Sequence, residues 1–168
     1  NLILLHVERA TEIVGLTKAI VVLLTALTVV PFYKLSRALD LPDDGARIAT
    51  MLLATSSSVL ILPTINTTSM TLFFGTMCLW VLIRAVKGGS VFTAAILGFA
   101  YAIFLMFSFT ASVFGVLMAL TTLIGWCTKA FSIGRIARAG VISLLVVCLI
   151  HLAIFVMARF NIIACFLE

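Results

Sequence analysis

The stretch that decides the fold is GGSVFTAAILGFAYAIFLMFSFTASVFGVLMALTTLIGWCT, residues 88–128, which contains no Asp, Glu, Lys or Arg. As one straight helix it would extend about 61 Å at 1.5 Å per residue, whereas the hydrocarbon core of a bilayer is about 30 Å thick. The stretch must therefore fold back as two helices. We expect the bend at 107–112, because hydroxyl side chains interrupt the apolar run there and can bond backbone groups that a bend frees.

The composition of the whole chain is typical of a membrane protein. Apolar residues make up 64% of the 168 residues and charged residues 10%, whereas an average soluble domain has about 25% charged residues. The formal charge of +5 does not indicate nucleic-acid binding, because that needs Lys and Arg gathered on one water-facing surface. The fold class that we predict is an all-α transmembrane helix bundle with short loops, whose partner is the lipid bilayer.

A second apolar stretch also requires a fold-back. Residues 48–83 carry no charge over 36 positions, and Pro63 marks the break because proline removes a backbone donor. Spans of about 20 residues then number about six: near 18–33, 48–63, 70–84, 91–107, 112–128 and 139–158, after an outer interfacial helix start at 1–17. The chain opens with Asn1 and shows no signal-peptide architecture, so we interpret it as an internal part of a longer protein.

Two polar connections have turn chemistry. In the segment LDLPDDGAR, either Asp43 or Asp44 is placed to cap the helix that follows. These adjacent carboxylates could also act as general acid and base, but Asp-Asp-Gly after Pro is ordinary in turns. Farther along, the pair at 88–89 suits the C-terminal cap of one helix, and Ser90 suits the N-cap of the next.

Several residues inside the spans invite specific interpretations. Gly98 with Ala102, and Gly115 with Ala119, place small residues four apart, which lets helices approach closely in lipid. Tyr101 lies away from both ends of its span, so we expect its hydroxyl to point into the bundle.

His151 is an ionisable residue within a span. Such a residue suggests function by default, yet a neutral imidazole can also be satisfied by a carbonyl group of a neighbour. The cysteines lie far apart without metal-ligand spacing, which favours ordinary thiol packing and no metal site; they are Cys78, Cys127, Cys148 and Cys165.

The basic residues predict an orientation, because cytoplasmic loops carry the excess of Lys and Arg. Most of them fall on one side if the spans alternate, and the loops near 63–69 and 108–112 contain none. We therefore expect those loops and both chain ends outside, and three loops in the cytoplasm: Lys34–Arg47, Arg84–Gly89 and Lys129–Arg138. Interfacial aromatic residues near the basic clusters agree with this orientation; they are Tyr33, Trp80 and Trp126.

The order of features resembles a known family over residues 15–131. The segments that carry the likeness are PFYKLSRAL (31–39), LATSSS (53–58), LWVLIRA (79–85), LGFAYA (97–102) and FSFTA (107–111). In this order they look like the central spans of GT-C superfamily membrane glycosyltransferases, the group that includes protein O-mannosyltransferases and aminoarabinose transferases.

The resemblance implies transfer of a sugar from a polyprenyl-phosphate carrier to an acceptor on the outer face of a prokaryotic cytoplasmic membrane. The lipid-linked sugar would be the donor, and the catalytic carboxylate would lie in a first outer loop that precedes Asn1. The bend carries no cation, so its hydroxyl groups are the donors available for the carrier phosphate. The candidate substrate-binding residues are Ser108, Thr110, Ser112, Asn66, Glu8 and Glu12.

Two alternatives stay open. Glu8 and Glu12 share a helical face and could face a substrate or metal, or could simply lie in a solvated helix start. The whole chain could also belong to a non-catalytic polytopic membrane protein, either a carrier or an assembly subunit, since no Asp or Glu lies within any predicted span.

Overall fold

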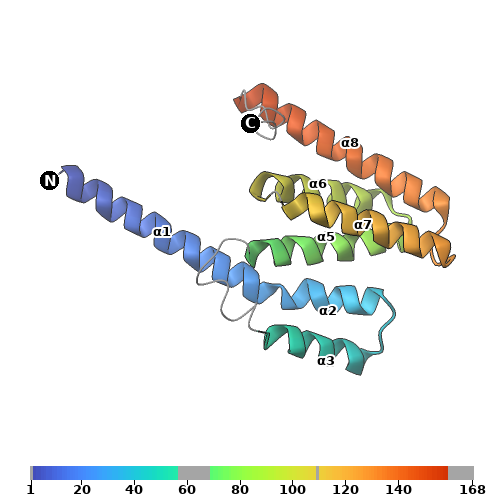
Figure 1. Cartoon of the computed structure of the whole chain (residues 1–168). Coiled ribbons are helices and arrows are strands. Elements are labelled where there is room, and N and C mark those ends of the chain that lie inside the picture. Colours follow the sequence, from blue (N-terminus) through green and yellow to red (C-terminus); the bar gives the residue numbers. More distant parts are fainter. Residues whose placement is uncertain (1, 57–68, 109, 159–168) are drawn as a thin grey trace. The chain divides into compact units, whose positions relative to one another are not determined.

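The structure is a computed structural model that describes residues 2–56, 69–108 and 110–158, with side chains at 13–56, 71–106, 108 and 110–157. In these residues every regular element is an α-helix, which confirms the all-α prediction (Figure 1). The helices are α1 (Leu2–Leu27), α2 (Val29–Ala38), α3 (Asp43–Ala54), α5 (Ser69–Gly88), α6 (Val91–Phe107), α7 (Thr110–Cys127) and α8 (Ile133–Ala158).

Four apolar helical segments in the described residues are long enough to cross a membrane, as expected of an integral membrane protein. They are Ile13–Ala38, Thr71–Gly88, Thr110–Cys127 and Ile133–Met157, and Val91–Met106 is a shorter apolar helix. The predicted span at 48–63 begins within α3 and runs beyond the described residues. The total of six spans therefore stays a prediction.

The chain divides into two compact units, residues 1–76 and 77–168, with the boundary inside α5. In the first unit, α1 and α2 are separated by a break at Thr28, whose N–H bonds the carbonyl of Thr25 at 3.1 Å. Pro31 causes this break, because it lacks an N–H and its ring crowds the carbonyl four residues earlier.

Helices α2 and α3 form a hairpin in the first unit. The turn between them passes through Asp40, which adopts a positive φ of 65°. The N-cap position of α3 is Pro42, and no side chain caps this helix. The prediction that Asp43 or Asp44 is the cap was wrong. They lie one and two residues after Pro42, in the first turn of α3, where a carboxylate still interacts favourably with the positive end of the helix dipole.

In the second unit, α6 packs mainly against α8 rather than against α7, its neighbour in sequence. The closest approach is at Gly98, where a Cβ atom would lie 2.5 Å from the carbonyl oxygen of Ser143. The Ser143 hydroxyl donates a 2.8 Å hydrogen bond to the carbonyl of Ala94, also across this interface. The prediction that a small residue at Gly98 permits close helix packing is confirmed, and Ala102 is fully buried.

The contact between α6 and α7 uses larger side chains. The Tyr101 hydroxyl donates to the carbonyl of Ala111 at 3.1 Å and lies directly against Gly115. The rings of Phe104 and Phe114 meet edge to face, with centroids 5.6 Å apart. The expectation that the Tyr101 hydroxyl points into the bundle is confirmed.

Two turns meet at one end of the second unit (Figure 1). Gly89 follows α5 with a φ of +64°, as expected of a glycine at a helix C-terminus. Ser90 occupies the N-cap position of α6, although its side chain makes no capping bond. The Nη1 atom of Arg135, in the first turn of α8, donates to the carbonyl of Lys87 at 2.8 Å and joins the α7–α8 connection to the α5–α6 turn.

Candidate functional site

The bend between α6 and α7 lies where the sequence predicts it. Ser108 leaves the helix with an extended φ of −158°, while its N–H still bonds the carbonyl of Phe104 at 3.1 Å. Its Oγ accepts a 3.2 Å hydrogen bond from the N–H of Thr110, and its carbonyl accepts one from Ala111 at 3.0 Å. Ser108 therefore ends α6, and its Oγ and carbonyl oxygen accept hydrogen bonds from the first two residues of α7.

The three predicted hydroxyl residues of the bend differ in accessibility. Ser108 and Thr110 are half-buried, whereas Ser112 is exposed in the first turn of α7. The first turn of a helix presents N–H groups without helical partners, and these favour an anion. With no charged side chain in the first turn of α7, an anion would be held there by neutral donors, which are weaker than charge-assisted ones.

The side chains of the other three predicted site residues lie outside the part of the chain that the structure describes. Asn66 lies outside the described residues. Glu8 and Glu12 belong to α1, in a part of the helix where the structure describes the backbone and no side chains. Their predicted contact with a substrate stays a prediction.

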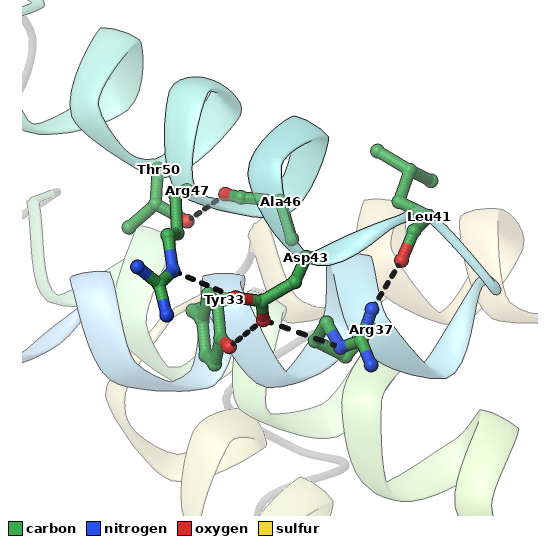
Figure 2. Close-up of polar contacts among 7 residues, drawn as sticks. All are labelled: Tyr33, Arg37, Leu41, Asp43, Ala46, Arg47 and Thr50. Carbon is green, nitrogen blue, oxygen red and sulfur yellow. Dashed lines mark hydrogen bonds and ion pairs between the residues drawn. The ribbon is translucent and has the colours of Figure 1, made fainter.

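A polar cluster that the sequence did not reveal joins α2 to α3 (Figure 2). The Tyr33 hydroxyl donates to Oδ1 of Asp43 at 2.6 Å, and the Nε atom of Arg47 lies 2.8 Å from Oδ2. The Nε atom of Arg37 lies 3.8 Å from Oδ1, and its Nη1 donates to the carbonyl of Leu41 at 2.7 Å. The cluster thus fixes the α2–α3 turn through one carboxylate.

The contacts in this cluster favour a structural role for Asp43 over a role as general acid or base. The hydrogen bond from Tyr33, helped by the charges of Arg47 and Arg37, holds the pKa of Asp43 below its ordinary value of 3.8. Both carboxylate oxygens are engaged, so Asp43 is ionised at neutral pH and acts as a structural acceptor. A signal was present in the sequence: Arg37 follows Tyr33 by four positions and Arg47 follows Asp43 by four, which places each pair on one helical face.

A cavity of about 190 Å³ lies within the second unit, and the sequence did not predict it. Its walls come from four helices, with α7 on one side and α8 on another. The lining residues are Leu82, Val86, Leu97, Tyr101, Met118, Ala119, Thr122, Ile136, Gly140 and Ser143.

The hydroxyl hydrogens in this cavity are already committed. Tyr101 donates to Ala111 and Ser143 donates to Ala94, each to a main-chain carbonyl of another helix. Thr122 donates to the carbonyl of Ala119 within its own helix. A ligand in the cavity therefore meets apolar surface and no free hydroxyl donor, which suits hydrocarbon better than a sugar.

The remaining singled-out side chains form no site in the described residues. Nδ1 of His151 lies 2.8 Å from the carbonyl of Val147, one turn back in α8, so the imidazole finds its partner within its own helix. Cys78 is a buried free thiol, as the packing interpretation expects, whereas Cys127 and Cys148 are free and exposed. Cys165 lies outside the described residues.

The chain matches no protein-family profile, no curated protein and no solved structure.

Proposed function

We propose that this chain is part of the membrane domain of a GT-C-like glycosyltransferase, which transfers a sugar from a polyprenyl-phosphate carrier to an acceptor on the outer face of the membrane. The observation that carries the proposal is the bend at Ser108, which closes α6 and opens α7 at the position where the resembling segments would place the carrier phosphate. The apolar helices of both units supply the membrane setting that a lipid-linked donor requires.

The proposed role of the bend is to hold the carrier phosphate. The exposed hydroxyl of Ser112 and those first-turn N–H groups of α7 that Ser108 does not bind are donors of the kind that bind phosphate at helix N-termini. Ser108 would act as a positioning residue, because its bonds to Thr110 and Ala111 set the direction in which α7 begins. The proposal requires the catalytic carboxylate to come from outside the described spans.

The test uses the longest natural chain that contains these residues, purified in lipid nanodiscs. Polyprenyl-phosphate mannose and polyprenyl-phosphate aminoarabinose, both radiolabelled in the sugar, serve as probes, and loss of label from the lipid is the readout. We expect Ser112→Ala to raise KM for the lipid donor with little change in thermal stability. We expect Ser108→Leu to raise KM as well, together with a loss of thermal stability, because the hydrogen bond from Thr110 is removed.

Thr121→Val is the matched control, because Thr121 is a half-buried hydroxyl residue of the same helix that bonds the carbonyl of Leu117 and lies away from the bend. Its KM should equal that of the wild type. If the wild type turns over the donor and both Ser112→Ala and Ser108→Leu keep its KM, the bend does not bind the carrier phosphate. Failure of the wild type to consume either donor would favour the non-catalytic alternative, a carrier or assembly subunit.

A further inference from the structure

The part of the second unit that the structure describes carries positive charge without an acidic residue to balance it. Residues 77–158 contain no Asp or Glu. Their cations form one basic cluster, which consists of Arg84, Lys87, Lys129, Arg135 and Arg138. These residues belong to the α5–α6 and α7–α8 turns or to the helix ends beside them, and the two turns meet through the 2.8 Å bond from Arg135 to the carbonyl of Lys87. Residues 77–158 therefore supply no carboxylate to the basic cluster, which leaves it open to an anion from elsewhere.

Within the basic cluster, Arg135 and Arg138 lie at a helix end where a cation is unfavourable and a nearby anion is stabilising. Lys87 lies in the last turn of α5, where the helix dipole favours a cation. Arg84 lies over the ring of Trp80 at 5.9 Å from its centroid. Arg135 and Arg138 instead lie in the first two turns of α8, at the positive end of its dipole, and the first turn has no acidic residue.

Two residues that line the apolar cavity are sequence neighbours of Arg135 and of Lys87, to which Arg135 bonds. The lining residue Ile136 follows Arg135 in α8, and the lining residue Val86 precedes Lys87. From there the cavity extends between α7 and α8, where Ala119 and Gly140 are both lining and exposed. The cavity is thus open to the surface between two membrane-length helices.

The cavity suits a length of hydrocarbon chain. Its volume of about 190 Å³ is larger than the apolar cavity of about 150 Å³ that binds benzene in another protein. Because its hydroxyl hydrogens are used within the protein, water gains few partners there. An amphiphile could bind both features, with its anionic head on the basic cluster and its apolar tail in the cavity.

We propose that this end of the second unit is a binding site for an anionic phospholipid, with the lipid phosphate on Arg135 and one acyl chain in the cavity between α7 and α8. The guanidinium of Arg135 uses one of its five N–H donors on the carbonyl of Lys87, so the others can take a phosphate. The site lies at the opposite end of α6 from the Ser108 bend and does not depend on the proposed transferase activity.

The test compares two lipids with the same chains and different head charge. The longest natural chain is purified, delipidated and titrated with dioleoyl phosphatidylglycerol or dioleoyl phosphatidylcholine, and bound lipid is counted by native mass spectrometry. We expect the wild type to bind phosphatidylglycerol more tightly, and Arg135→Gln to weaken this binding about fivefold without changing the binding of phosphatidylcholine.

Arg138→Gln is the matched control for charge. Arg138 lies two residues beyond Ile136, roughly 200° around the helix from the cavity wall, so its loss should weaken binding less. An equal effect of Arg135→Gln and Arg138→Gln, or equal binding of the two lipids by the wild type, would overturn the proposal. Competition by inorganic phosphate as effective as competition by phosphatidylglycerol would also overturn it, because the site would then take a free anion.

A second pair of variants tests the cavity. A Cβ atom at Gly140 meets no atom within 4 Å, so Gly140→Phe can fill the cavity without a backbone clash, and we expect it to lower phosphatidylglycerol binding severalfold. Gly15→Phe, on α1, has the same open surroundings and should bind lipid like the wild type. Dihexanoyl phosphatidylglycerol should bind more weakly than the dioleoyl lipid. Unchanged binding in Gly140→Phe, or equal binding of short and long chains, would exclude the acyl-chain site.

Discussion

The Tyr33 hydroxyl and the Asp43 carboxylate, ten positions apart in sequence, form a 2.6 Å hydrogen bond that ties α2 to the first turn of α3. This bond is the first cause of the lowered pKa of Asp43. Tyr33→Phe should therefore move the pKa of Asp43 up toward its ordinary value of 3.8. Carboxyl NMR titration in detergent, with Asp43→Asn to assign the signal, measures the change. Tyr101→Phe, in the other unit, should leave the pKa of Asp43 where it is.

The same carboxylate makes the hairpin sensitive to acid. Because the pKa of Asp43 is lower in the folded protein, its stabilising contribution is fully present well above 3.8 and is lost as the pH falls through the folded-state pKa. We expect the difference in thermal midpoint between the wild type and Asp43→Asn to be constant near neutral pH and to shrink on acidification below 3.8. A difference that grows with acid would contradict this assignment.

Gly98 should tolerate no side chain. A Cβ atom there would lie 2.5 Å from the carbonyl oxygen and 2.9 Å from the Cα of Ser143, and both are backbone atoms that cannot rotate away. Gly98→Ala should lower the free energy of unfolding by about 1–3 kcal/mol, measured by titration with sodium dodecyl sulfate. Gly140→Ala, in the facing helix with open surroundings, is the matched control and should be neutral or slightly stabilising.

The hydrogen bond from Ser143 to Ala94 crosses the same interface. Interhelical bonds in membranes average about 0.6 kcal/mol, so Ser143→Ala should destabilise the protein by roughly that amount in the same titration. Thr122→Val removes a hydroxyl group that bonds only the carbonyl of Ala119 in its own helix and should cost less. A larger loss from Thr122→Val would mean that the α6–α8 bond contributes little.

The orientation predicted from the basic loops can be tested by chemical labelling in whole cells. Cys127 and Cys148 are exposed thiols, so the test starts from a variant with all native cysteines replaced by Ser. A membrane-impermeant maleimide added from outside should label Asn66→Cys and leave Asp44→Cys unlabelled until the membrane is opened. The reverse pattern would invert the topology.

The fold class could be predicted because it depends on composition and on lengths of uncharged sequence. Residues 88–128 are too long for one span and too apolar for water, and the hydroxyl residues near Ser108 are the natural place to bend, where the structure also bends. Gly98 was found for the same reason, since a small residue in a lipid-embedded helix usually marks a close approach.

The interhelical hydrogen bonds and the cavity could not be predicted. They depend on which helices pack together, and the local sequence does not contain that information. The pairing of α6 with α8 brings Ser143 to Ala94, and the cavity exists only once α7 and α8 are placed around Tyr101. The Tyr33–Asp43 bond likewise appears only when the hairpin closes. The sequence indicated only a turn role for Asp43. Its partner Tyr33 lies on the facing helix α2, and its partner Arg47 lies one turn later in α3.

The pairing of α6 with α8 also sets an order of events during synthesis. Ser143 follows its partner residue Ala94 by 49 positions, and at about 5–20 residues per second the ribosome needs roughly 2 to 10 s to make the intervening chain. During that interval the Gly98 face of α6 is already made, and its partner helix does not yet exist. A lipid tail, the translocation machinery or a chaperone must contact that face until α8 is made. Assembly of this unit therefore includes a step in which α8 replaces a transient partner of α6 within the membrane.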